Sequence, residues 1–297
     1  MIEGTNTVDK AFLFGTKKRV CQEVNIPKVR KQTNLEWSEW RDFIWRNFLS
    51  GKYQVTQPPG ERILQQVYAP TTEIQLLHNM KWDGTWVETI KNLPPVWRQI
   101  LGKIKAPVDN GKMIQEKSLN GTLVGASDGS VKQGKDVDAG GYAYTVQLWE
   151  TDTYGITGYA PCPSSTKVTS LTAELYGLIA STLVVFMLGK KISGGRTSRT
   201  ITLSADNEQA IKMGQDWKTP INISETTQHE YDLWKLMWNL AQESNIKIEY
   251  QWVRGHQDTL KTGERIFGPF PRLVQLNIEM DDRAKDAADI AQVHTLR

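Results

Sequence analysis

Four acidic residues in the second part of the chain lie at the ends or edges of predicted secondary structure: Asp128, Glu174, Asp206 and Asp281. Carboxylates that crowd together repel one another unless a cation lies between them. Mg²⁺ is a hard cation that takes oxygen ligands and keeps several waters, which leaves room for phosphate. If the four side chains meet, a pair of such ions would allow hydrolysis of a phosphodiester.

Each of these residues also has a purely structural interpretation. Asp128 is followed by glycine between two strand-like runs, and Asp-Gly is a strong hairpin-turn signal. Glu174 could be an exposed helix residue. Asp206 could cap a helix, with Gln209 completing a capping box. Asp281 could interact with the N-terminal dipole of the last helix.

The hydrophobic pattern predicts the elements that carry these residues. Strands are predicted at 123–127, 140–149, 154–160, 200–206 and 246–253, and helices at 170–188, 227–243 and 277–291. The first three strands have short connections and form an antiparallel meander, whereas strands joined across helices are usually parallel. The sequence therefore predicts an α/β fold with a five-stranded mixed sheet flanked by helices.

Helical and strand periodicity also predict where the acids point. Glu174 and Asp281 lie at the edges of the apolar stripes of their helices, whereas Asp282 points outward. Asp128 and Asp206 each end a strand that we expect to be central. If these strands are parallel neighbours, both carboxylates emerge at the same edge of the sheet, where ligands of such sheets bind.

The composition describes a soluble globular protein: 39% of the 297 residues are hydrophobic and 23% are charged. The longest nearly apolar stretch, 178–188, is too short to span a bilayer, and the N-terminus lacks a signal-peptide pattern. We therefore expect no membrane partner. Two distant cysteines, Cys21 and Cys162, argue against a disulfide framework or a cysteine zinc site, and fit an intracellular location.

Charge is divided unevenly along the chain. Residues 1–118 hold 18 Lys and Arg against 12 Asp and Glu, and the remainder holds 18 against 21. Basic residues favour partners that carry phosphate. We predict an N-terminal, mainly helical extension over 1–118 and a second domain over 119–297. Within the extension, helices are predicted at 37–48 and 95–104, and 105–121 is predicted to be a linker.

Five short motifs resemble, in their order, those of the ribonuclease H family, especially the versions carried in retroelement polyproteins. They are "ASDGS" with Asp128, "SLTAEL" with Glu174, "LSADNEQA" with Asp206, "VRGHQD" with His256 and "LNIEMDDRAKDAA" with Asp281. The resemblance implies a ribonuclease H-like fold and a metal-dependent endonuclease that hydrolyses the RNA strand of RNA–DNA hybrids. It also implies a link to a retroelement reverse transcriptase, with residues 1–118 as a remnant of a polymerase connection.

The same resemblance implies a role for each residue. Asp128 would bridge two Mg²⁺ ions, for which Mn²⁺ would substitute. Glu174 and Asp206 would bind the ion that activates water, with Glu174 near the ribose 2′-OH, and Asp281 would hold the other ion. His256 would assist proton transfer or product release. Taken alone, His256 is equally well an exposed loop histidine.

Two other function classes remain open from the sequence. One is a catalytically silent module that binds nucleic acid or a polymerase, and the other is a DNA-cutting relative such as a transposase or junction resolvase. Four acids at one sheet edge argue against the first class, because binding alone does not require clustered carboxylates. The "VRGHQD" loop before the last acid favours the hybrid-cutting branch over the second class.

Overall fold

The computed structural model of the chain describes residues 2–7, 25–29, 72–107, 109–118, 123–133, 138–151, 154–163, 168–192, 200–215, 228–260 and 262–295. The chain divides into two compact units. The smaller unit holds two antiparallel strands, β1 (Ile2–Thr7) and β2 (Asn25–Val29). The larger unit, residues 72–218 and 229–297, contains the main sheet. The helix predicted at 37–48 lies outside the described residues.

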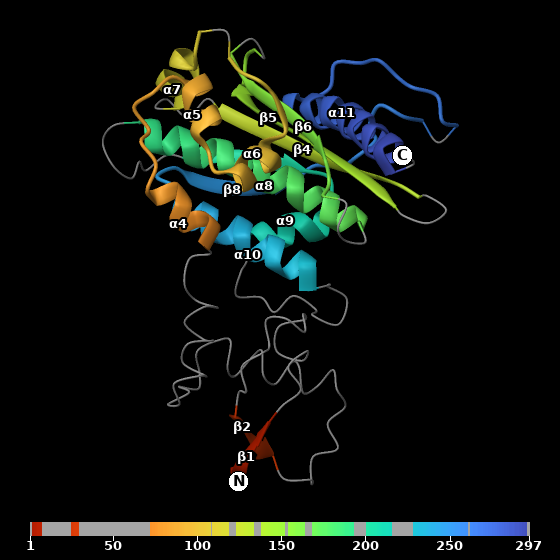
Figure 1. The fold of residues 1–297 in the computed structure, drawn as a ribbon. Coiled ribbons are helices and arrows are strands. Elements are labelled where there is room, and N and C mark those ends of the chain that lie inside the picture. Colours follow the sequence, from red (N-terminus) through yellow and green to blue (C-terminus); the bar gives the residue numbers. More distant parts are fainter. Residues whose placement is uncertain are drawn as a thin grey trace. The chain divides into compact units, whose positions relative to one another are not determined.

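A six-stranded mixed sheet forms the centre of the larger unit (Figure 1). Its order is β3-β6-β5-β4-β7-β8, with β3 (Lys103–Lys105), β4 (Leu123–Lys132), β5 (Ala139–Leu148), β6 (Ile156–Pro161), β7 (Thr200–Ala205) and β8 (Lys247–Trp252). β4, β5 and β6 form an antiparallel meander, and β4, β7 and β8 run parallel. These five strands confirm the predicted mixed sheet, and β3 adds a short antiparallel edge beside β6.

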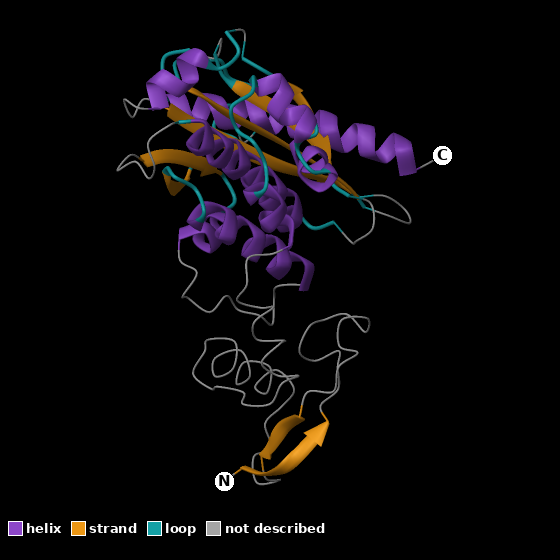
Figure 2. Ribbon diagram, turned by 60° about the vertical axis from the view of Figure 1, so that its left-hand side comes forward, coloured by secondary structure: helices purple, strands orange, loops and turns teal. Residues whose placement is uncertain are grey.

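Helices cover both faces of this sheet (Figure 2). α8 (Ser170–Lys191) approaches β4 so closely that a Cβ on Gly129 would lie 2.4 Å from the Glu174 nitrogen. α11 (Arg272–Thr295) approaches β5 in the same way, because a Cβ on Gly141 would lie 2.2 Å from the Ala288 nitrogen. Gly129 pairs with Tyr142, the neighbour of Gly141, and side chains alternate along a strand. The two glycines therefore face opposite sides, and so do α8 and α11.

α8 is a core helix. Every residue from Leu171 to Gly189 is buried, and Thr169 begins the helix by accepting a hydrogen bond from the Thr172 backbone. The predicted stripe with Glu174 at its edge is therefore too narrow, because the helix is covered all round. α8 is long and apolar enough to cross a membrane by length and composition, but its apolar window is completely buried in the protein.

Two further helices lie next to α8. They are α9 (Glu208–Gln215) and α10 (Gln228–Gln242). Tyr250 of β8 packs against Gly214 of α9, and its hydroxyl forms a 2.9 Å hydrogen bond with the Thr182 hydroxyl of α8. The Trp234 indole of α10 donates to the Met213 carbonyl of α9. These contacts fix the two helices beside the parallel part of the sheet.

The segment before the sheet is folded and packs on it. It contains α4 (Thr72–His78), α5 (Trp86–Asn92), α6 (Pro95–Leu101) and α7 (Lys112–Ser118). The hydroxyls of Tyr142 and Tyr144 donate to the carbonyls of Ile100 and Leu101 at the end of α6. The boundary predicted between residues 118 and 119 stays a prediction, although β3 and these helices share the core of the larger unit.

The linker predicted over 105–121 is wrong, since α7 lies within it. The Asp109 carboxylate accepts hydrogen bonds from the backbones of Gly111 and Met113, which supplies partners to the free amides of the first turn. Ile114 is completely buried and anchors the helix. A capped helix with one anchoring residue shows little periodicity, which is why the pattern indicated a linker.

Candidate active site

Asp128 lies within β4 rather than at a turn. The strand continues to Lys132, and Asp128 pairs with Ala143 of β5. The hairpin-turn interpretation is therefore wrong. The parallel pairing of β4 with β7 ends at Ala126 and Ser204, so the two strands separate just before Asp128. This separation opens space for the carboxylate at the end of the parallel ladder.

Asp206 follows the last residue of β7 and emerges at the same place. It does not cap α9, because the Asn207 carboxamide accepts the hydrogen bond from the Ala210 backbone. The N-cap interpretation of Asp206 is therefore wrong, and its carboxylate is available to the site. The expectation that Asp128 and Asp206 lie at the same edge is met, since β4 and β7 are parallel neighbours.

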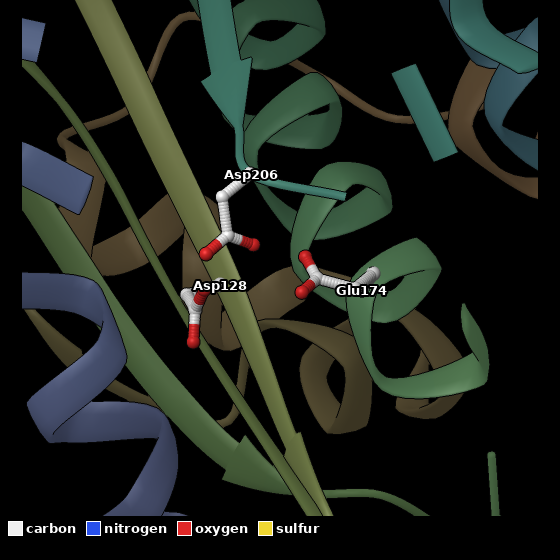
Figure 3. Close-up of side chains that lie close together, drawn as sticks. All are labelled: Asp128, Glu174 and Asp206. Carbon is white, nitrogen blue, oxygen red and sulfur yellow. The ribbon is translucent and has the colours of Figure 1, made fainter. Parts of the chain in front are cut away.

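Glu174 reaches the same point from α8. The absence of a side chain on Gly129 lets the first turns of α8 lie directly against β4. Glu174 is only 3% exposed, so the interpretation as a solvent-facing helix residue is wrong. Ligand atoms of Asp128, Glu174 and Asp206 all lie within 4.8 Å of one another. Their carboxylates point toward a common centre (Figure 3).

Burial raises the pKa of all three carboxyl groups, and the charge of at least one neighbouring acid adds to this effect in each. Desolvation, followed by the negative charges of Asp206 and Asp281, raises the pKa of Asp128 to about 9. Desolvation, followed by the charges of Asp128 and Asp206, raises the pKa of Glu174 well above its usual value. Burial also raises the pKa of Asp206, against the opposing charge of His256. Without a counter-ion, this cluster retains protons near neutral pH.

Asp281 lies beside the cluster of three on α11. The helix begins at Arg272, so Asp281 is well inside it and the N-terminal dipole interpretation is wrong. Its side chain is 17% exposed and accepts a 2.6 Å hydrogen bond from Lys285. The outward neighbour Asp282 is 49% exposed, as the helical period predicts. Asp281 is close enough for its charge to raise the pKa values of Asp128 and Asp206.

His256 faces Asp281 from the loop after β8. Its Nδ1 lies 3.8 Å from Oδ2 of Asp281, and its side chain is 66% exposed. The backbone at His256 has a φ of 50°, a left-handed conformation that is uncommon for residues other than glycine. The preceding Gly255 abuts the site, because a Cβ there would lie 2.1 Å from Oδ2 of Asp206. The loop thus touches two of the acids at once.

A small hairpin after His256 holds this loop against α11. The Ile266 backbone donates to the Asp258 carbonyl, and Thr259 and Arg265 form an isolated bridge. The Arg265 guanidinium donates from Nε to Asp258 and from Nη2 to Asp282, at 2.8 and 2.6 Å. In the sequence, Arg265 is one of three basic residues of the loop 261–272 that we expect to contact a nucleic-acid backbone. Its bonds to Asp258 and Asp282 follow from no local pattern.

The donor set suits a hard divalent cation. It consists only of carboxylate oxygens, and Oε2 of Glu174 is buried without a hydrogen-bond partner. This oxygen lies at the centre of an acidic cluster, so it is placed to bind a cation. Asp128, Glu174 and Asp206 are the residues that would hold such an ion, with Asp281 beside them.

The chain is similar to known proteins in its fold. No protein-family model and no curated protein matches the sequence. Among solved structures, the fold is similar to the N-terminal RNase H domain of Rv2228c from Mycobacterium tuberculosis, at 20% identity and a TM-score of 0.40, over 58% of this chain and 97% of that one.

Two further solved structures are similar. LC11-RNase H1 in complex with an RNA/DNA hybrid is 13% identical, with a TM-score of 0.38, over 57% of this chain and 99% of that one. RNase H1 of the archaeon Halobacterium salinarum is 14% identical, with a TM-score of 0.31, over 57% and 98%. Identities this low carry no function from one protein to another, and at TM-scores below 0.5 no residue is equated between the structures.

Proposed function

We propose that this protein is a metal-dependent endonuclease of the ribonuclease H type that hydrolyses the RNA strand of RNA–DNA hybrids. The observation that supports the proposal most is the convergence of Asp128, Glu174 and Asp206 at the end of the parallel strands, with their ligand atoms within 4.8 Å of one another. Asp281 and His256 lie beside this cluster, as the ribonuclease H resemblance of the five sequence motifs implies.

The proposal gives each residue a task. Asp128, Glu174, Asp206 and Asp281 would together hold two divalent ions, with Asp128 shared between them, Glu174 and Asp206 on one and Asp281 on the other. Two Mg²⁺ or Mn²⁺ ions bound there would supply the Lewis-acid chemistry for phosphodiester hydrolysis, which is activation of a water molecule and stabilisation of the departing oxygen. Glu174 lies near the ribose 2′-OH, which distinguishes RNA from DNA. His256 exchanges a proton with the reacting oxygens or assists product release, since its exposed imidazole faces Asp281 beside the cluster.

The partner in this proposal is an RNA–DNA hybrid, and the origin is a retroelement reverse transcriptase. The order of the five motifs supports this origin, because the resemblance is to the versions of the domain carried in retroelement polyproteins. The excess of basic residues in 1–118 fits a segment that contacts nucleic acid or a polymerase domain. Intracellular residence is part of the same proposal.

One substrate panel tests the function. Purified protein is incubated with Mg²⁺ or Mn²⁺ and with a hybrid, a DNA duplex and an RNA duplex of the same sequence. We expect cleavage of the hybrid alone, and its loss in Asp128→Asn. Binding without cleavage would instead indicate a silent module, and cleavage of the DNA duplex would indicate a DNA-cutting relative.

A further inference from the structure

The end of β8 carries an exposed aromatic ring beside the acidic cluster. Trp252 is 46% exposed although tryptophan is among the residues that folding usually buries to a large extent. Its indole N–H donates a 2.8 Å hydrogen bond to the backbone carbonyl of Asp206. The bond fixes the ring next to Asp206 and leaves a large part of its surface open to solvent. The exposed part of the Trp252 ring therefore faces solvent next to Asp206.

Arg254, two residues after Trp252, carries an exposed positive charge. It is exposed, and its guanidinium has no hydrogen-bond or ion-pair partner among the described residues. The Arg254 backbone is fixed, because its carbonyl accepts a hydrogen bond from Gln257. Trp252 on one side bonds Asp206, and Gly255 on the other side abuts the Asp206 carboxylate. The Arg254 backbone is thus held between two residues that contact Asp206, while its guanidinium is exposed.

This arrangement fits a nucleic-acid backbone. A phosphodiester carries a negative charge, and an exposed guanidinium near the site can bind it. An exposed flat ring and, two residues farther along the chain, an exposed guanidinium match a sugar–phosphate chain, which alternates an apolar sugar face with a charged phosphate. Arg and Trp are also the residues that most often dominate interface energies.

We propose that Trp252 and Arg254 form a contact surface for the strand that enters the acidic cluster, with the ring against a sugar and the guanidinium on a neighbouring phosphate. The inference rests on the proposed nuclease function, because it takes the acidic cluster as the place of cleavage. It assigns substrate-positioning residues that lie outside the group of acids and His256.

The chain offers a matched control. Trp149 is 48% exposed, almost the same as Trp252. It follows the end of β5, where Leu148 pairs with Leu123 at the start of β4. Because Asp128 lies farther along β4 and Asp206 follows the end of the parallel strand β7, Trp149 lies at the opposite end of the sheet from the acids. Any loss that comes only from removing an exposed tryptophan should therefore appear in both variants.

The test measures hybrid affinity in an Asp128→Asn background with Mg²⁺, so that cleavage does not interfere. Trp252→Leu should weaken binding about fivefold or more, as expected for truncation of a tryptophan central to an interface, whereas Trp252→Phe and Trp149→Leu should stay within about twofold of the parent. Arg254→Gln should lower the slope of log affinity against log salt by about 0.9, the value for one phosphate contact.

Several outcomes would overturn the inference: equal affinities for Trp252→Leu and its parent, an equal loss in Trp149→Leu, or an equal loss in Trp252→Phe, which keeps a ring but lacks the N–H group. If Trp252→Leu does not fold, the salt slope of Arg254→Gln decides. The two proposals fail separately. A wild-type protein that leaves the hybrid intact while Trp252→Leu weakens binding would contradict the nuclease alone, and cleavage with unchanged binding would contradict the contact surface alone.

Discussion

At the residue scale, the site consists of carboxyl groups whose ionisation is unfavourable in the folded protein. Asp128 and Glu174 are each 3% exposed, and repulsion among the acids adds to the cost of burial. A divalent cation would supply the opposite charge and the ligand that Oε2 of Glu174 lacks. Without a metal ion, the folded protein should therefore be less stable at pH values that favour ionised carboxylates.

The stability of the metal-free protein should fall as the pH rises from about 4 to about 9. The pKa of Asp128 is about 9 in the folded protein against an ordinary 3.8, so between these values the folded state binds more protons than the unfolded state. The free energy of unfolding then decreases with rising pH. Melting temperatures measured in EDTA and in Mg²⁺ check this, and the gain from Mg²⁺ should be larger at about pH 8 than at about pH 5.

Asp128→Asn provides the control for this experiment, since it removes one titrating carboxyl and one metal ligand. The gain from Mg²⁺ should become small in this variant and lose most of its pH dependence. A metal-free protein that becomes more stable between these pH values, or a Mg²⁺ effect that is the same at both, would contradict the account.

Much of the site at this scale follows from the sequence alone. Asp128 and Asp206 were placed at one edge because the strands that carry them were expected to be parallel neighbours, and the helical period separated inward Asp281 from outward Asp282. The sequence does not mark Trp252 as part of the site, and it does not show that Gly255 and Arg265 contact the acidic residues. Their roles depend on contacts with Asp206 and Asp282, which only the folded chain brings within reach.

At the element scale, the hairpin after β8 sets the spacing between His256 and Asp281. Arg265 joins Asp258, close to His256 in the chain, to Asp282, the neighbour of Asp281. Arginine suits this task because its planar guanidinium presents several donors in a fixed geometry, whereas lysine presents a single point charge. The loop and α11 are therefore connected by side-chain bonds at the very place where their reactive residues meet.

Arg265→Gln should lower kcat for hybrid cleavage about tenfold, as found for groups that orient ligands from outside the metal's coordination, and should leave KM within about twofold. Steady-state kinetics of the two parameters check this prediction. Lys212→Gln is the matched control, since it breaks an exposed pair with Glu208 on α9. An unchanged kcat in Arg265→Gln, or an equal fall in Lys212→Gln, would show that the hairpin contact has no part in positioning.

The limits of sequence reasoning are also visible in the elements. The pattern ended the first strand at Ser127, because Asp128 and Gly129 resemble a turn, whereas pairing with β5 carries β4 on to Lys132. The alternation of Tyr142 and Tyr144 with other residues predicts a half-exposed strand for β5. It is buried throughout, because α11 covers the face that the intervening small residues leave open. Cover by a distant helix cannot be read from local alternation.

At the scale of the whole molecule, the sheet depends on the segment that precedes it. The Tyr142 and Tyr144 hydroxyls find their acceptors at the end of α6, and Trp86 and Trp97 of this segment are almost completely buried. Removal of the segment would leave buried hydroxyls without partners and would expose apolar surface. The strands β1 and β2 belong to the other compact unit.

A chain of residues 72–297 should therefore fold and cleave hybrid, whereas residues 119–297 should not fold stably. Circular dichroism melting curves and the cleavage assay on both fragments check this expectation. A cooperative, active fragment 119–297 would support the boundary predicted from the sequence, and an inactive fragment 72–297 would show that residues 1–71 take part in the reaction.

The central claim is that the acids at the end of β4 and β7, with Asp281 beside them, form one metal-dependent centre for hydrolysis of RNA in a hybrid. It is tested most directly by Mg²⁺-dependent cleavage of hybrids labelled on either strand, with wild-type protein, Asp281→Asn and Asp286→Asn. Asp286 is exposed on the same helix and serves as the control. We expect the RNA strand alone to be cut. Asp281→Asn should lower the cleavage rate at least about 100-fold, which is more than a group outside the coordination sphere contributes. Asp286→Asn should keep full activity. Cleavage that persists in EDTA, or equal activity in the two variants, would contradict it.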